Sequence, residues 1–570
     1  MRTQRLKYFF FAGILVCFFV LIACNNNRQK DNTIARTPEE LQERVSGLIK
    51  KNTARALAEN GKMDDSTIVL SQARLVKFLY EKKTYQPLWC EKETWVPAGD
   101  SLYNFIRNSQ LYGLFPEVYH VSQLKNIREK FFADSLATGD RTNAALWSQA
   151  DILLTDALVQ IIKDVKLGRL PQDSITLRKD SVLSDDFYLQ LFASIQQSGL
   201  EKMIQSLEPN HKGYQELKAG IKNFLDSANY KTFTRVPYPE KDIVKFKKAL
   251  QMRLTEGGFM VPDSMLADST QLAEAVKKFQ KRKGITVDGR AGEGTVRMLN
   301  VTDEEKFIRI AISLDKYKML PEKMPSRYIW VNTSANQLAV IDNDEVKLTS
   351  KVICGKPKTR TPVLTSNINE LITYPQWVPP PSIVSKEILP AVKKNPGYLE
   401  KKGFSLVDSK GNEVDPYTVD WTKYTKTMPY RVVQGSGDAN ALGIMKFVFS
   451  NKYSVYLHDT NQRYLFGNAM RSLSHGCVRV QEWERLAFYI LRNDSLHSGN
   501  RGYAKIDSVK TWLRKKQKKS LVLRNPIPVF IRYFTCEGQN GNILFFDDVY
   551  SEDKQLREKY FGSKYTLSGL

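Results

Sequence analysis

The sequence predicts an α+β multidomain protein with a mainly helical scaffold, a small three-helix module and a mainly β domain that carries a capping insertion. Apolar residues recur at spacings of three and four up to about residue 231, three short helical segments follow near 244–300, and apolar and polar residues alternate from Tyr328 onward. A chain of 570 residues is also too long for one compact core, so several domains are expected.

The expected divisions follow these changes of pattern. In order they are a leader at 1–24, a tether at 25–36, the helical scaffold at 37–235, the three-helix module at 240–300, a helical linker at 301–327, the β domain at 328–535 with its capping insertion at 379–433, and a C-terminal extension at 536–570. The sequence assigns no role to the extra tail after Phe546.

The composition is that of folded, globular protein, with 42% hydrophobic and 11% aromatic residues. The formal net charge of +24 would favour anionic partners. Lysine and arginine are nevertheless scattered among aspartate and glutamate and form no basic arm. We therefore expect a solvated basic surface and no nucleic-acid partner.

The N-terminus has the features of a secretion signal. Basic residues in the first seven positions precede an apolar run from Tyr8 to Ala23, which is shorter than the about 20 residues of a membrane-spanning helix. Leu21-Ile22-Ala23-Cys24 resembles a bacterial lipobox, which implies cleavage after Ala23 and a lipid on Cys24. Asn25 follows instead of an acidic residue, so we expect a periplasm-facing lipoprotein of the cell envelope, favouring the outer membrane. The alternative is an uncleaved anchor or a simple signal.

The helical scaffold is predicted to begin near Thr37, which can cap a helix whose first residue is Pro38. A long apolar helix over 144–167 is expected to stop at Gly168. The aromatic residues of two turn-rich interruptions, 84–89 and 111–121, are expected to be core residues and not a binding site.

The three-helix module is expected to hold Phe279 and Leu299 in its core, with a turn at Asp288-Gly289 and a last helix that starts at Gly292. Its glycine-rich loop lacks the Lys-Ser/Thr ending and the preceding strand of a phosphate-binding loop. A nucleotide site is therefore not expected there.

The β domain is predicted from alternating runs near 328–355, 445–458 and 526–546, with hairpin turns at the Asn-Asp-Glu and Asn-Gln breaks. The segment 379–433, between the first and second runs, carries prolines, lysines and short helical pieces. We expect it to cap the site and to move.

The reactive residues gather in Tyr456–Val480, which holds two of the five histidines. Cys477 lies in a glycine turn before a helix that starts near Glu482, and His458 ends an apolar strand from which it can reach that turn. A thiol of ordinary pKa near 8.5 needs a neighbouring base or cation to react at neutral pH. No CxxC pair is present, so neither a metal nor another cofactor is expected.

HDT at 458–460, a loop, and SHGCVRV at 474–480 resemble the signature of YkuD-type L,D-transpeptidases. The resemblance implies that Cys477 is the nucleophile and His458 the base. It also implies supporting roles for the remaining signature residues, namely Ser474, His475, Gly476, Arg479 and Asp459. His475 is expected to point away from the thiol, and Arg479 to brace the turn or, less favoured, to bind a stem carboxylate. HDT replaces the HGT of many members, so the local turn is expected to differ.

The resemblance extends to the large YcbB-type branch, which combines a helical scaffold, a peptidoglycan-binding domain and a capped catalytic domain. The three-helix module resembles the peptidoglycan-binding domain at Ala275, Val276, Phe279, Gln280, Gly284, Val287, Asp288, Gly289, Gly292, Thr295 and Leu299. Such modules can also persist as spacers.

This family resemblance implies acyl transfer through a thioester on Cys477. A tetrapeptide stem would lose D-alanine, and an amine of a neighbouring stem would resolve the thioester, with backbone N–H groups around Gly476 and Cys477 holding the oxyanion. Peptidoglycan stem peptides, the membrane through the N-terminal lipid, and carbapenem-type β-lactams as covalent inhibitors are the implied partners.

Other functions remain open on the sequence alone. The same acyl-enzyme could pass its acyl group to water or to a protein lysine, and a non-catalytic wall-binding lipoprotein is a further alternative. A papain-type peptidase is disfavoured because its histidine follows the cysteine in the chain.

Overall fold

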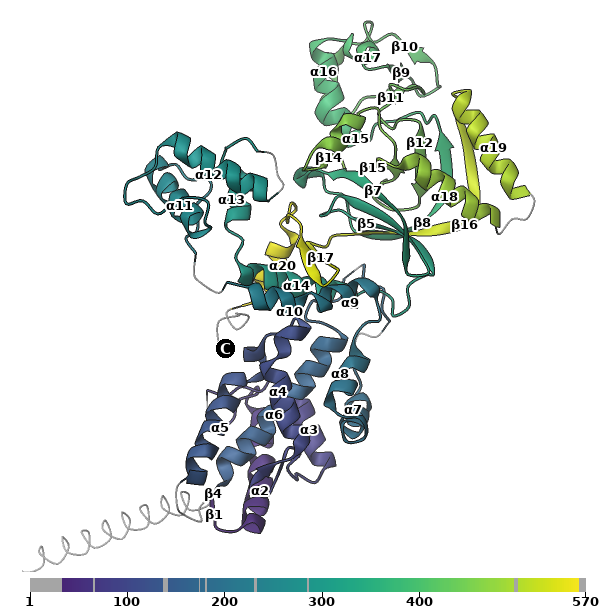
Figure 1. Cartoon of the computed structure of the whole chain (residues 1–570). Coiled ribbons are helices and arrows are strands. Elements are labelled where there is room, and N and C mark those ends of the chain that lie inside the picture. Colours follow the sequence, from purple (N-terminus) through teal and green to yellow (C-terminus); the bar gives the residue numbers. More distant parts are fainter. Residues whose placement is uncertain are drawn as a thin grey trace, which may run out of the picture.

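The computed structural model describes residues 33–64, 67–136, 142–173, 175–179, 182–229, 233–283, 287–496 and 501–562. Cys24 and the expected cleavage site lie outside these residues. Within them a helical N-terminal region, a three-helix module and a mainly β domain follow one another along the chain (Figure 1), which confirms the predicted fold class.

The scaffold is a bundle around α6 (Ala144–Lys166), which contacts α2, α3, α4, α5 and α8. The other elements are β1 (Ile34–Ala35), α2 (Pro38–Ala58), α3 (Ala73–Lys82), β2 (Cys90–Glu91), β3 (Thr94–Trp95), α4 (Pro97–Arg107), η1 (Ser109–Tyr112), η2 (Pro116–Tyr119), α5 (Val121–Leu136), β4 (Thr142–Asn143), α7 (Asp185–Ser198), α8 (Leu200–Leu207), α9 (Lys212–Ala219) and α10 (Ile221–Ser227). Thr37 caps α2 and Gly168 has a positive φ of 79° just past α6, as predicted.

Helix α6 is apolar because it is the centre of the bundle. Among the described residues it is the one helix long and apolar enough to cross a membrane, but 78% of that stretch is buried inside the protein. Its polar residues hold loops: Asp151 accepts the backbone N–H groups of Leu88 and Trp89, and Asp156 accepts those of Ser71 and Gln72. Buried carboxylates are thus hydrogen-bonded, as burial requires.

The three-helix module consists of α11 (Ile243–Glu256), α12 (Ser269–Arg282) and α13 (Glu293–Leu299). Phe279 and Leu299 are buried in its core, as predicted. Gln280 is buried too. Its side-chain amide forms hydrogen bonds with Asp288 and with the backbone of the turn at Gly289. The long helix α14 (Asp303–Lys318) continues from the module and packs on α9.

The β domain is one sheet of order β14-β7-β15-β13-β12-β8-β16-β5-β6, and a further pairing of β7 with β6 closes it on itself. The strands are β5 (Arg327–Asn332), β6 (Gln337–Asp342), β7 (Glu345–Gly355), β8 (Leu364–Thr373), β12 (Met445–Phe449), β13 (Leu457–His458), β14 (Ser472–Ser474), β15 (Val478–Val480) and β16 (Lys519–Arg532). Asn343 and Asp344 have positive φ angles of 51° and 62° in the β6–β7 hairpin, the turn predicted at the Asn-Asp-Glu break. The domain also carries the helices and turns η3 (Pro357–Thr359), η6 (Arg463–Gly467), α18 (Trp483–Leu496) and α19 (Arg501–Arg514).

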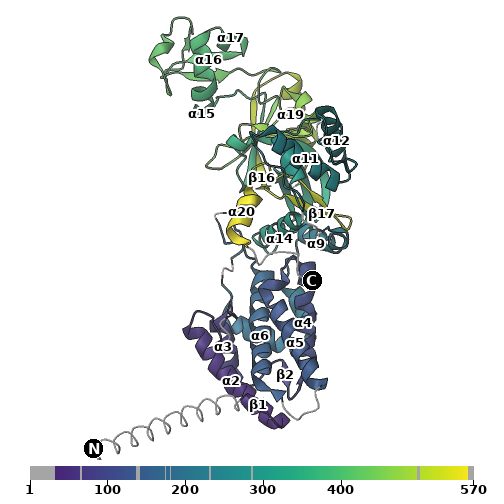
Figure 2. The same cartoon turned by 90° about the vertical axis from the view of Figure 1, so that its left-hand side faces the viewer.

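The C-terminal extension packs between the scaffold and the β domain, beside α14 (Figures 1 and 2). It consists of β17 (Cys536–Gln539), β18 (Asn542–Phe545) and α20 (Glu552–Tyr560). A Cβ at Gly538 would lie 2.1 Å from the carbonyl carbon of Glu216 in α9, so only glycine allows this close approach. Lys316 of α14 pairs with Glu552 and Asp553 of α20 at 2.9 and 2.8 Å. The tail without a predicted role therefore belongs to the core that joins the domains.

Candidate active site

The two residues expected to react lie on neighbouring strands. His458 ends β13, and Cys477 directly precedes β15. The strands are parallel, with His458 beside Arg479, and the Val478 N–H donates to the Tyr456 carbonyl at 3.1 Å. This register sets Tyr456 beside Cys477.

The turn before β15 is held by its own side chains. The Ser474 hydroxyl donates to the Cys477 carbonyl at 2.6 Å and accepts the Gly476 N–H at 3.1 Å. Gly476 has a φ of +122°, a conformation that favours glycine. Because its N–H is already bonded to Ser474, the expectation that Gly476 helps to hold an oxyanion is not met in this conformation. The Cys477 N–H makes no hydrogen bond to any described residue and is the available donor.

Cys477 is the accessible thiol of the described part of the chain. It is half-buried, whereas Cys90, Cys354 and Cys536 are free and buried. Burial raises the pKa of the Cys477 thiol, and hydrogen bonds from Tyr456 and the nearby charges of Lys446 and Arg479 oppose this rise.

His458 is 4% exposed, and its ring lies 5.6 Å from that of Tyr456. Burial, reinforced by the positive charge of Arg479, lowers the pKa of His458 to about 3. The imidazole is therefore neutral near pH 7. Together with the raised pKa of the thiol, this favours a neutral thiol and a neutral imidazole in the resting site, and not a thiolate–imidazolium pair.

Asp459 and Arg479 shape the walls of the site. The Asp459 carboxylate is buried and accepts the Ile444 N–H at 3.1 Å and an N–H of Arg463 at 2.9 Å. A Cβ at Gly443 would lie 2.3 Å from the same carboxylate, so Asp459 is fitted to the turn before β12. Arg479 donates to Gln462 of the loop at 2.9 Å and not to residues 474–476.

The capping insertion has its own small core. It contains α15 (Pro381–Ile383), η4 (Val384–Ile388), α16 (Leu389–Lys394), α17 (Tyr398–Lys401), η5 (Trp421–Lys423) and a sheet of β10 (Glu413–Val414), β9 (Phe404–Val407) and β11 (Arg431–Gln434). Leu389, Leu406 and Trp421 are buried together in this core. The Glu387 carboxylate in η4 forms a hydrogen bond with His475 Nε2 at 2.5 Å, so His475 contacts the insertion.

Sequence reasoning missed three residues of the site: Tyr456, Lys446 and Trp377. Lys446 lies opposite His458 on β12, and its ammonium is 4.0 Å from the centre of the Tyr456 ring. Burial raises the pKa of Tyr456, and the side chains of Cys477 and Trp377 lie close enough to its hydroxyl to influence that pKa. The two-residue spacing of Tyr456 and His458 places them on one face of a strand and could have identified Tyr456. Lys446 and Trp377 carry no comparable signal.

Residues 326–497 match the model of the family described as the L,D-transpeptidase catalytic domain, YkuD. This range contains β13, β15 and the capping insertion. The chain carries an L,D-transpeptidase catalytic domain. Residues 74–220 match the family described as a scaffold domain, and residues 247–299 match that described as "Putative peptidoglycan binding domain".

A curated relative, named "Putative L,D-transpeptidase", is known from Haemophilus influenzae. It is 33% identical over 248 residues, which cover 44% of this chain and 48% of the relative. The chain thus matches about half the length of that protein. A crystal structure of an L,D-transpeptidase from Stackebrandtia nassauensis is 15% identical and covers 53% of this chain and 97% of its own, with a TM-score of 0.17. The structure of an Ldtfm-avibactam carbamoyl enzyme is 12% identical over 39% and 76%, with a TM-score of 0.14. Neither structural likeness is strong enough to carry an argument.

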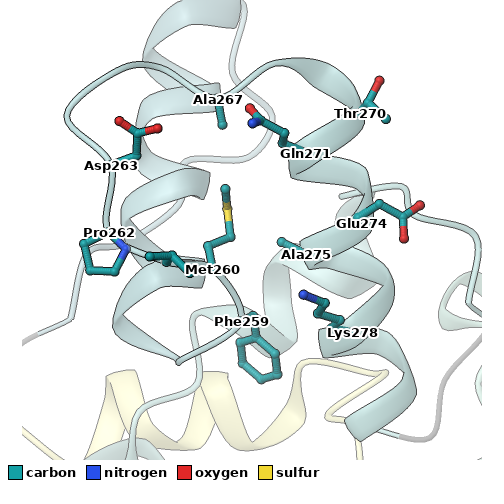
Figure 3. A pocket seen from close by; sticks show the side chains of 11 residues that line it. Phe259, Met260, Pro262, Asp263, Ala267, Thr270, Gln271, Glu274, Ala275 and Lys278 are labelled. Carbon is teal, nitrogen blue, oxygen red and sulfur yellow. The ribbon is translucent and has the colours of Figure 1, made fainter.

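The peptidoglycan-binding module, which accompanies the L,D-transpeptidase domain, has a groove of about 430 Å³ between the 259–267 loop and α12 (Figure 3). Met260 and Ala275 lie in its middle, and Asp263, Glu274 and Lys278 lie at its margin. An apolar floor with a polar margin is typical of a ligand groove.

We predict that the alkylation rate of Cys477 in the L,D-transpeptidase domain still rises with pH above the ordinary thiol pKa of about 8.5 and has no plateau near pH 7. The thiol pKa is raised, and a histidine with a pKa of about 3 supplies no positive charge to stabilise a thiolate at neutral pH. Iodoacetamide labelling, followed by intact mass across pH 5–10, measures this rate. Rapid labelling at pH 5 would instead indicate a thiolate–imidazolium pair. Cys477→Ala should leave no labelled site among the described residues, because their other thiols are buried.

Proposed function

We propose that the protein is an L,D-transpeptidase that cross-links peptidoglycan through a thioester on Cys477. The observation that carries the proposal is a half-buried thiol on a fixed glycine turn, next to a strand that pairs with the strand of a buried neutral histidine, within an L,D-transpeptidase catalytic domain. A neutral imidazole can accept a proton, which is the property that a general base needs.

In the first step the Cys477 sulfur attacks the carbonyl between the third residue and D-alanine of a tetrapeptide stem. The S–C bond forms, and the thiol proton passes to His458. The C–N bond then breaks, and His458 returns the proton to the amine of the leaving D-alanine. In this step the Cys477 N–H is the donor for the oxyanion.

Lys446 and Arg479 give the site positive charge. Arg479 is half-buried, and its Nε makes no hydrogen bond to described residues, so its guanidinium can donate hydrogen bonds to a carboxylate of the anionic stem. This role fits the contacts of Arg479 better than bracing of the turn, because Arg479 donates its hydrogen bond to Gln462 and not to a residue of the turn. The capping insertion then closes the other side of the stem through Glu387 and His475.

In the second step an amine of a neighbouring stem attacks the thioester, and His458 takes its proton. Water or a protein lysine could replace this amine without any change in the first step. The peptidoglycan-binding module supports a wall acceptor, and its groove is proposed to hold the polymer near the site. A non-catalytic wall-binding lipoprotein would leave Cys477 unacylated.

We predict that the purified protein converts tetrapeptide-bearing wall fragments into cross-linked stems and releases D-alanine, both seen by mass spectrometry. A carbapenem should add its mass to Cys477. Cys477→Ala should abolish the adduct and the cross-links, whereas the matched control Cys354→Ala, a fully buried thiol on β7, should keep both. Hydrolysed stems without cross-links would assign the acyl group to water. An adduct on Cys477→Ala would overturn the proposal.

We predict that His458→Ala slows carbapenem acylation by about two to four orders of magnitude, the usual effect of losing a general base. His475→Ser should slow it far less, because the His475 ring bonds Glu387 of the insertion. Stopped-flow or mass-resolved acylation rates compare the two variants. A near-normal His458→Ala beside an inactive His475→Ser would reverse the assignment of the base.

We propose further that the protein is a lipoprotein anchored through Cys24, with the outer membrane favoured. We predict that the N-terminal peptide of the mature protein begins at Cys24 and carries lipid, as measured by mass spectrometry of the membrane fraction. Cys24→Ser should leave the chain without lipid. A mature chain that starts elsewhere and lacks lipid would contradict the anchor.

A further inference from the structure

The C-terminal extension reaches the turn that carries the nucleophile. We propose that this extension is a brace for the turn and that Tyr550 is a positioning residue, which sets the orientation of the Gly476–Cys477 peptide group. The inference rests on the proposed role of Cys477 and adds a contact from outside the matched catalytic range of 326–497.

Two side chains connect the extension to the turn. The Tyr550 hydroxyl donates to the Gly355 carbonyl at 2.8 Å and accepts the Thr361 N–H at 3.3 Å. The Thr361 hydroxyl accepts the Gly355 N–H and donates to the Gly476 carbonyl, both at 2.8 Å. Tyr550 therefore holds the segment that in turn holds Gly476.

The Gly476 carbonyl belongs to the same planar peptide group as the Cys477 N–H, and the two point in opposite directions. When Thr361 fixes the carbonyl, it also fixes the direction of this N–H, the available donor for an oxyanion. An error in its direction would weaken the hydrogen bond to the developing charge. The brace thus acts on the transition state through Thr361 and touches no substrate.

The brace is rigid and buried. Tyr550 is 3% exposed and Thr361 is 4% exposed. The Tyr550 ring stacks on Tyr533, with centroids 5.1 Å apart and an interplanar angle of 17°. The Tyr550 N–H donates to the Tyr533 hydroxyl at 3.1 Å, and that hydroxyl donates to Asp548 at 2.7 Å. Such a network leaves Tyr550 little freedom to move.

The same short segment is tied to the other domains. Asp547 forms a two-point ion pair with Arg297 of the peptidoglycan-binding module at 3.0 and 2.5 Å. Asp553 pairs with Lys316 of α14 at 2.8 Å. The brace therefore connects the turn of the nucleophile to the module and to the helix that follows it.

The test uses the full chain with Tyr550→Phe, Thr361→Val, Thr361→Ser and the double variant Tyr550→Phe/Thr361→Val. Tyr560→Phe, at the end of α20, is the matched control, because its hydroxyl has no bond to described residues. We expect Tyr550→Phe and Thr361→Val each to slow the maximal rate of carbapenem acylation about tenfold, with little change in the half-saturating concentration. Thr361→Ser, which keeps the hydroxyl, should stay within about twofold of the wild type.

The double variant separates positioning from general stability. If Tyr550 acts through Thr361, the double variant should be about as slow as Thr361→Val alone, whereas independent effects would multiply. Multiplying effects, or a Tyr550→Phe rate equal to that of Tyr560→Phe, would overturn the brace.

Hydrogen exchange of the peptide that covers residues 472–480 gives a readout that needs no catalysis. We expect faster exchange in Tyr550→Phe and not in Tyr560→Phe, and unchanged exchange would overturn the brace. If the wild type is not acylated at all, the proposed function fails, while this exchange measurement still decides the brace.

Discussion

The parallel pairing of β13 with β15 is the contact on which the arrangement of the reactive groups depends. It sets Tyr456 beside Cys477 and His458 beside Arg479, although the two segments are separated by a loop with no regular strand pairing to either. A shift of one residue would turn His458 to the other face of its strand. The remaining features, from the closed sheet to the Asp459 carboxylate beside Gly443, keep these two short strands in register.

Burial governs the chemistry of this arrangement. The low-dielectric surroundings disfavour charge on both Cys477 and His458, so the resting pair is neutral, and in the proposed mechanism proton transfer would accompany bond formation. Lys446 and Arg479 oppose the charging of His458 and favour a negative sulfur. The site is therefore arranged to favour negative charge, and in the proposed function an anionic stem would meet two cations at the same place.

Local patterns predicted the parts of the fold that depend on local interactions. Thr37 and Pro38 start α2, Asn343 and Asp344 form a hairpin turn, and Phe279 fills the core of the module, because capping, turn geometry and periodicity are encoded within a few residues. The residues of the signature likewise predicted which two segments carry His458 and Cys477. The use of the Gly476 N–H by Ser474 was not predictable, since it depends on a side-chain rotamer in the folded turn. Lys446, Trp377 and Tyr550 were not predicted, because contacts between segments far apart in the sequence bring them to the site.

The extension follows the site residues in the chain, and this order has a consequence for biosynthesis. Ribosomes build the chain from the N-terminus, so His458, Thr361 and Cys477 are all present before Tyr550 is added. The sheet can form around Cys477 while the peptide group next to it still lacks the proposed support from Tyr550. A nascent chain, or one clipped before Tyr550, would therefore hold an assembled but poorly aligned site, and full alignment would come only once Tyr550 has been made.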